Sequence, residues 1–285
     1  MILYLREIIL DMIKYFISII AAIILLPLPL SASSVEVGGA LRYSWWERQV
    51  NEEYRGNFSP GLQYGPLLTI NMPKHFSFSS VFYYGNYTRS WWNGSEMFVR
   101  YDSESSLLYS ATRFLAIFAG FSFSDYNLPV RWPSPVLYAR YKTMIYEFSP
   151  AIGLSFSVHL FQELYLTIKT SIFYCYSIER NGRSFLIYQA SSGAELYPLI
   201  SSTAQKDKLG LNSHLQLYYP ISKINTVLAF GCRYQYASVG SRSHGFKAMV
   251  YEHYWGITAS VSYRLNIPTA VADETEEKEN VEPES

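Results

Sequence analysis

The sequence contains little charge and no long apolar run after its N-terminal region. Asp, Glu, Lys and Arg make up 16% of the residues, whereas soluble domains average about 25%. The lack of a further run of about 20 apolar residues excludes a bundle of transmembrane helices. Aromatic side chains are abundant instead, with 26 Tyr, 17 Phe and 6 Trp. Low charge with many aromatics is typical of a transmembrane β-barrel, and an aromatic-rich soluble β-sandwich is the alternative.

Cysteine is also scarce, with only Cys175 and Cys232 in the chain. The alternation of residue types places Cys175 on the polar face of its segment and Cys232 on the lipid-facing side of another. Thiols on opposite faces cannot be joined without moving the backbone, so we expect no disulfide. Their spacing suits no metal site, and nothing in the sequence calls for a cofactor.

One long apolar stretch lies within residues 12–30. Lys14 precedes it, and two prolines and several small residues follow it. This order predicts a secretory signal peptide over residues 1–32, with translation starting at Met1 or Met12. A retained membrane anchor is the alternative reading of this stretch.

Residues 33–266 alternate between apolar and polar side chains with a period of two, which predicts β-strands with one apolar face. In residues 253–266, for example, Trp255, Ile257 and Val261 share one face, while Gly256 and Arg264 share the other. Ten segments of roughly membrane-spanning length follow this pattern. They are residues 35–46, 58–72, 76–87, 96–110, 114–126, 144–158, 164–178, 206–219, 225–237 and 253–266. The fold class predicted is all-β, a closed antiparallel up-and-down transmembrane barrel.

The connections between these segments alternate between long and short. Outer-membrane barrels have short periplasmic turns and longer external loops, so both ends of this barrel are expected in the periplasm. Residues 184–200 hold two short apolar runs around a Ser-Ser-Gly turn, which we interpret as an external hairpin prolonging the seventh and eighth strands. Barrels of 12 or 8 strands are the alternative counts.

Eleven charged residues have the inward phase, six positive and five negative. They are Glu36, Arg42, Arg100, Asp102, Glu104, Glu147, Lys169, Lys208, Arg233, Glu252 and Arg264. A balanced set predicts a paired network rather than an ion-selective pore. Ten strands are also close to the size at which side chains fill the interior. We therefore expect a largely filled lumen, with a narrow pore for small solutes as the alternative.

The last segment resembles the β-signal of bacterial outer-membrane proteins. The residues that carry the likeness are Tyr254, Gly256, Ala259, Val261 and Tyr263. The resemblance is to a class, and it implies insertion into the outer membrane of a Gram-negative-type bacterium by the barrel-assembly machinery. It departs from the class in position, because residues 267–285 follow the signal. That segment holds seven acids and one Lys, which predicts a disordered acidic periplasmic tail.

Enzymatic activity is the competing function class. Barrel proteases of the omptin type carry acidic pairs and an Asp–His pair at the outer rim. No such spacing occurs among the rim candidates Asp125, Asp207, His244, Glu252 and His253. Neighbouring Ser241, Ser243 and His244 supply the atoms of a hydrolase, but such residues are usual in flexible loops. We expect no enzyme, and keep a barrel-embedded hydrolase, acting on peptide or lipid, as an alternative.

The long connections carry aromatic and Arg side chains suited to recognition surfaces. They are Trp132, Tyr138, Tyr141, Phe185, Tyr188, Tyr197, Arg131, Arg140, Arg180 and Arg183. The sequence thus predicts a monomeric barrel with a structural or surface-binding role. Its expected partners are outer-membrane lipids, the assembly machinery and an extracellular or periplasmic ligand, and no nucleic acid.

Overall fold

The structure is a computed structural model that describes residues 34–50, 54–73, 75–91, 94–133, 137–181, 184–190, 193–199, 203–241 and 250–266. The predicted signal peptide and acidic tail lie outside these ranges, as do Ser243 and His244. Within the described ranges, no helix is long and apolar enough to cross a membrane.

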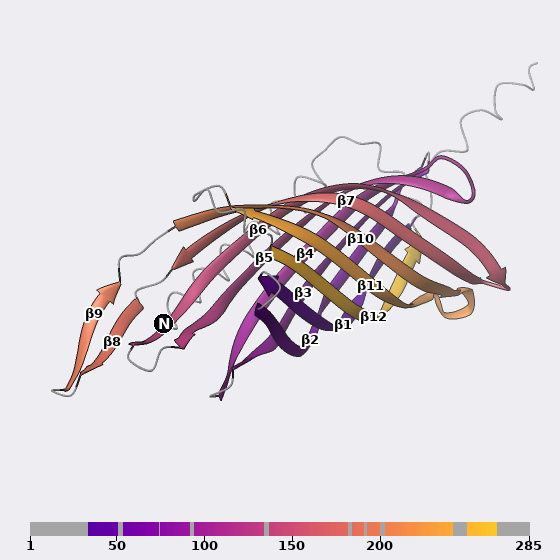
Figure 1. The fold of residues 1–285 in the computed structure, drawn as a ribbon. Helices are drawn as coiled ribbons and strands as arrows, with labels where there is room; N and C mark the ends of the chain where they lie inside the picture. The colour runs from indigo at the N-terminus through magenta and orange to yellow at the C-terminus, as the bar shows by residue number, and fades with distance from the viewer. Residues whose placement is uncertain are drawn as a thin grey trace, which may run out of the picture. The chain divides into compact units, whose positions relative to one another are not determined.

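Ten antiparallel strands close into a barrel, which confirms the predicted fold class and strand count (Figure 1). The strands are β1 (Ser34–Val50), β2 (Tyr54–Asn71), β3 (Phe76–Trp91), β4 (Gly94–Ser110), β5 (Leu115–Pro133), β6 (Leu137–Phe161), β7 (Leu164–Asn181), β10 (Thr203–Ile221), β11 (Thr226–Ser241) and β12 (Val250–Asn266). Each pairs with its neighbours in chain order, and β1 pairs with β12 along its whole length. This seam leaves no exposed edge in the barrel wall, as an apolar membrane requires.

Two further strands, β8 (Ser184–Ala190) and β9 (Gly193–Leu199), form a hairpin that projects beyond the wall (Figure 1). The predicted hairpin is confirmed, and β8 prolongs the seventh barrel strand as expected. The β6–β7 ladder ends at Thr143 opposite Asn181, and β8 continues it along β6 from Arg140 opposite Phe185 to Leu137 opposite Tyr188. β9 pairs with β8 and precedes the eighth barrel strand, β10, in the chain.

The strands extend further at the long connections than the alternation predicted. Residues 47–57 and 127–143 were expected as loops, yet β1 reaches Val50 and the β5–β6 ladder continues to Pro133 opposite Tyr138. Backbone hydrogen bonding does not need lipid, so a ladder continues where the outward face meets water and apolar alternation ends. Ser34 pairs with both Asn266 and Asn71, so the barrel begins and ends where the short connections lie. We call this the short-connection end and the opposite one the long-connection end.

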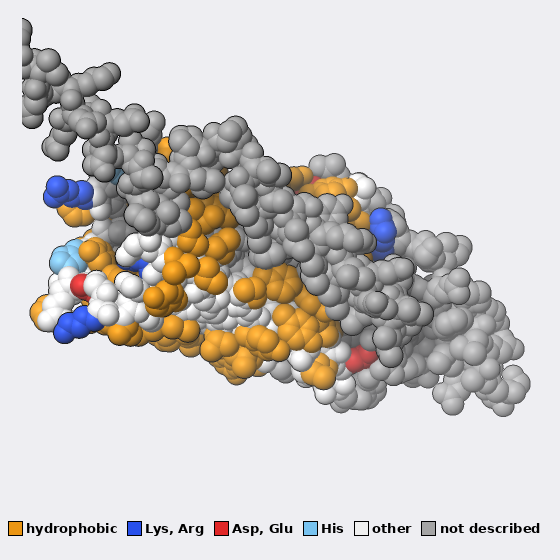
Figure 2. Space-filling view, turned by 180° about the vertical axis from the view of Figure 1, so that it is seen from behind, with side chains coloured by type: hydrophobic (Ala, Val, Ile, Leu, Met, Phe, Trp, Pro, Cys, Tyr) orange, Lys and Arg blue, Asp and Glu red, His pale blue; other side chains and the backbone are white. Residues whose placement is uncertain are grey.

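Burial confirms which residues face outward. Val37 is 52% exposed and Leu41 is 49% exposed, whereas Arg42, the next residue and of the opposite phase, is 2% exposed. Figure 2 shows hydrophobic side chains gathered over the part of the wall that it views. Cys175 is buried toward the lumen and Cys232 is exposed, as their phases predicted.

Aromatic side chains mark both margins of this outer apolar surface. Toward the long-connection end, Trp45 lies opposite Trp255 across the seam. Toward the short-connection end, Phe76 packs against Tyr109 with ring centroids 5.0 Å apart. Two such girdles are a property of membrane β-barrels.

Candidate functional site

The lumen is the candidate site, because the strand register brings polar side chains together there from around the ring. All eleven predicted lumen charges occupy buried or partly buried inward positions. The structure joins ten of them into three groups of ion pairs and leaves Lys169 outside all three.

The central group is built on Arg42, whose guanidinium contacts the Asp102 carboxylate and lies 2.6 Å from Glu104. Arg42 and Asp102 are 2% and 3% exposed, so both charges are removed from bulk water. Arg100 adds a second guanidinium, with its Nε 2.9 Å from Asp102 Oδ1. Gln63 accepts a hydrogen bond from Arg42 Nε at 2.9 Å and donates one to Asp102 at 2.9 Å.

One ion pair of the central group crosses the lumen. Arg233 on β11 pairs with Glu104 on β4, and these strands are five places apart in the ring of ten. The Arg233 Nε also donates to Asn212 Oδ1 at 2.8 Å. Opposite walls are therefore connected through side chains at this level.

The second group contains one cation and two acids. The Lys208 Nζ lies 2.5 Å from both Glu147 Oε1 and Glu252 Oε2. Tyr126 donates to Glu147 at 2.9 Å. Lys208 comes from β10, so this group joins it to β6 on one side and β12 on the other.

The third group lies at the short-connection end. Arg264 donates to Glu36 Oε1 at 2.8 Å and to the Tyr218 hydroxyl at 2.6 Å. Tyr218 itself donates to Glu36 at 3.1 Å, and Asn71 donates to Ser34 at 2.9 Å. Glu36 thus has a cation and a hydroxyl as partners near the mouth.

Sequence reasoning missed a buried cluster of five aromatic and two aliphatic side chains, here called the aromatic cluster, that packs in the lumen on the long-connection side of the charges. Its members are Trp46, Tyr87, Phe98, Tyr126, Leu128, Ile145 and Tyr254. A signal for it was present, since each of these side chains occupies an inward position of its strand. Large apolar rings at inward positions indicate a packed interior rather than a water-filled one.

Tyr254 connects the aromatic cluster to the charges. The guanidinium carbons of Arg42, Arg100 and Arg233 lie 5.4, 5.8 and 5.9 Å from its ring centroid. Arg100 also lies 4.9 Å from the ring centroid of Trp46. These distances allow cation–π attraction, so each guanidinium has an aromatic face as well as a carboxylate.

The residues of the β-signal-like pattern divide between the two faces of β12. Tyr254 and Gly256 are buried toward the lumen, whereas Val261 and Tyr263 are exposed on the outer wall and Ala259 shares their phase. The same strand therefore supplies part of the lumen interior and part of the outer surface.

The rim residues weighed as catalytic candidates do not come together. Tyr174 donates to Asp207 at 2.5 Å, while the Tyr234 hydroxyl and His253 Nδ1 are hydrogen-bonded at 3.0 Å. Glu252 points inward to Lys208, and Asp125 is buried without a histidine partner among the described residues. Those same ranges contain no cluster of three or more His, Cys, Asp or Glu side chains that could hold a metal ion. Of the predicted recognition residues in the long connections, only Arg180 has a described side chain, and it is exposed.

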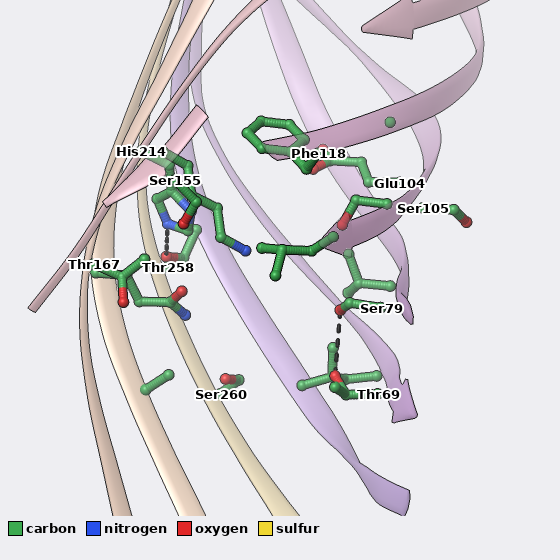
Figure 3. Close-up of a pocket in the computed structure, with 18 of the residues that line it drawn as sticks. Thr69, Ser79, Glu104, Ser105, Phe118, Ser155, Thr167, His214, Thr258 and Ser260 are labelled. Carbon is green, nitrogen blue, oxygen red and sulfur yellow. Dashed lines mark hydrogen bonds between the residues drawn. The ribbon is translucent and has the colours of Figure 1, made fainter. Parts of the chain in front are cut away.

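A cavity of about 570 Å³ occupies the lumen between the central group and the short-connection end. Fifteen of its lining residues are Ser or Thr, and Figure 3 shows several of them pointing inward from facing walls. Among them, His214 Nε2 is hydrogen-bonded to Thr258 at 3.1 Å and Thr69 donates to Ser79 at 3.3 Å. On the long-connection side of this cavity, a void of only about 40 Å³ lies among the charged side chains. The lumen is thus open in one half and filled in the other.

Solved structures of bacterial outer-membrane barrels share this architecture. The translocator domain of the autotransporter NalP from Neisseria meningitidis aligns with a TM-score of 0.51 and 12% identity, over 90% of this chain and 96% of that one. The outer-membrane protease OmpT from Escherichia coli aligns with a TM-score of 0.51 and 11% identity, over 84% and 99% of the two chains. No protein-family model matches the sequence, and no curated protein matches it.

The class is therefore defined at the level of fold: this chain has the fold of bacterial outer-membrane β-barrels, the class that its last strand resembles. At 11–12% identity the likeness concerns the fold alone, and the two neighbours differ in their own roles.

Proposed function

We propose that this protein is an integral outer-membrane barrel of a Gram-negative-type bacterium with a lumen closed on the long-connection side. It has a structural or surface-binding role, without enzymatic activity, and works as a monomer with both termini in the periplasm. The single observation that carries this proposal is the pairing of Arg233 with Glu104 across the ring. The aromatic cluster packs on the long-connection side of this pair. A path for solutes would have to separate this part-buried pair and the Arg42–Asp102 pair beside it, which is 2% and 3% exposed, and uncompensated buried charges are costly.

The external surface is the natural place for the binding role. The long connections and the β8–β9 hairpin lie at the end that outer-membrane barrels turn to the outside. Their sequence is rich in aromatic and Arg residues, which are frequent at binding hot spots. The ligand class that this surface recognises would be extracellular.

Assembly gives the protein its other partners. We infer that residues 1–32 direct export, that the β12 pattern is recognised by the barrel-assembly machinery, and that residues 267–285 stay solvated in the periplasm. Support comes from the position of β12, which closes the barrel against β1. Outer-membrane lipids would cover the exposed apolar wall.

A narrow pore is the second candidate, and the cavity of about 570 Å³ is what favours it. Planar-bilayer recording of the refolded barrel separates the two. The closed lumen predicts no stable conductance of porin size, and a persistent open level of that size would overturn the proposal.

Catalysis has its own test, since the fold neighbours include a protease. Ser243→Ala and His244→Ala should leave any hydrolysis of peptides or lipids by the purified barrel unchanged. A loss of hydrolysis in either variant would contradict the non-enzymatic role.

A further inference from the structure

Lys169 differs from every other predicted lumen charge. The set contains six cations and five acids, and each acid has an ion pair with at least one of the other five cations. Among the described residues, Lys169 has no ion-pair partner and no side-chain hydrogen bond. The excess positive charge of the lumen is therefore concentrated on one ammonium group, which lies on the wall of the large cavity.

The side chains around Lys169 are neutral hydrogen-bonding groups. Ser155 on β6 and His214 on β10 lie directly opposite it in the strand register. Thr167 and Ser171 flank it on the same face of β7. Fifteen of the residues that line the cavity are Ser or Thr, and Ser155, Thr167 and Ser171 are the ones that the register and phase place beside Lys169. Hydroxyl and ammonium donors together are the groups that hold an oxyanion.

No carboxylate is available to neutralise this field. The two acids that line the cavity are Glu36, which is paired with Arg264, and Glu104, which is paired with Arg42 and Arg233. Among the interactions described, Lys169 has no acidic partner. An anion entering from the short-connection end would meet one unpaired positive charge.

We propose that this cavity binds a small polar solute bearing one oxyanion, a carboxylate or a phosphate, with Lys169 as its charge partner. A volume of about 570 Å³ is within the range of small-molecule sites, which is roughly 300–1,000 Å³. The many hydroxyls favour a hydroxylated solute over an apolar one, because they can exchange hydrogen bonds with it. The solute would enter from the short-connection end, since the charges and aromatic cluster block the other end.

Calorimetric titration of the full-length refolded barrel tests this site with matched probes. Gluconate carries a carboxylate on a hydroxylated chain, glucitol is its uncharged counterpart, and inorganic phosphate supplies the other oxyanion. Gluconate or phosphate should bind and glucitol should not. The oxyanion that binds shows whether the natural ligand carries a carboxylate or a phosphate. No binding of either oxyanion, or equal binding of glucitol, would overturn the proposal.

Substitutions then assign the binding to Lys169. Lys169→Met should weaken oxyanion binding by about tenfold or more, because a charge-assisted interaction is lost. Lys169→Arg should keep most of the affinity. The control is Lys223→Met, which makes the same change in the exposed turn after β10 and should leave affinity unaltered. Retained affinity in Lys169→Met would refute the assignment.

A measurement on the unsubstituted protein avoids dependence on how variants fold. Acetylation of Lys169 by a water-soluble acetylating reagent that reacts with amines can be followed by mass spectrometry. The oxyanion that binds should slow this acetylation, and glucitol should not. Unchanged acetylation in the presence of saturating gluconate and of phosphate would contradict the site. This inference stands apart from the closed-lumen proposal, because a conducting barrel with an oxyanion site would fail the bilayer test and still pass this one.

Discussion

Asp102 offers the sharpest test of the filled half of the lumen. Its carboxylate accepts hydrogen bonds from Arg42, Arg100, Gln63 and Ser124, and it is 3% exposed. Asp102→Asn keeps the size of the side chain but replaces one acceptor oxygen with a donor. Arg100 then loses its carboxylate, and Arg42 keeps only Glu104.

Breaking a buried ion pair by removing one partner costs about 3–5 kcal/mol. We expect Asp102→Asn to lower the free energy of unfolding by that amount, a large part of the roughly 5–15 kcal/mol typical of a domain. The measurement is urea unfolding in lipid vesicles, followed by tryptophan fluorescence and by the gel mobility of unheated samples.

Glu163→Gln is the matched control. Glu163 also accepts from a serine hydroxyl, that of Ser222 at 2.7 Å, but in an exposed connection. Its loss should change stability by no more than about 0.5 kcal/mol. If Asp102→Asn cost less than about 1 kcal/mol, the carboxylate would not be confined among buried cations, and the argument for a closed lumen would fail.

Three further predictions test the lumen, the hairpin and the wall. Tyr254→Phe keeps the ring facing three guanidiniums and should cost under about 1 kcal/mol in the same unfolding assay, whereas Tyr254→Ala should cost about 3–5 kcal/mol; similar losses would contradict the packing role. Replacing residues 184–199 by a short Gly-Ser linker should preserve heat-modifiable gel mobility, because among the described strands this hairpin pairs with no part of the barrel except the β6 extension Leu137–Arg140; a barrel that no longer folds would refute that reading. In the folded barrel, an apolar maleimide should label Cys232 and leave Cys175 unmodified until the protein unfolds, and mass spectrometry that found the reverse would show the faces to be inverted.

Most of the barrel could be predicted from alternation. A side chain on a strand points to one face or the other, so apolar residues at Val37 and Leu41 and a charge at Arg42 were enough to orient β1. The length of the segments and the alternation of connections then indicated ten membrane strands. The ends of the strands were not predictable in the same way, because the ladder from Val130 to Pro133 continues where lipid no longer selects residue types.

The sequence also predicted which side chains face the lumen and that their charges nearly balance, but it did not predict which of these side chains pair. Glu104 and Arg233 are 129 residues apart, and nothing local relates them. They meet because closure of the ring puts β4 across from β11. The aromatic cluster was missed because inward rings such as Tyr87 and Phe98 look like ordinary strand residues until several strands converge on one level.

The amino-acid pattern alone thus specifies the class of fold, the two faces of each strand and the near balance of lumen charge. These properties depend on neighbours one or two positions away, which the chain order already contains. Closure of the barrel specifies the rest: which carboxylate meets which guanidinium, where the lumen is packed and where it is hollow. It also leaves Lys169 without a counter-charge, because the five acids of the lumen lie within reach of the other five cations and not of this one.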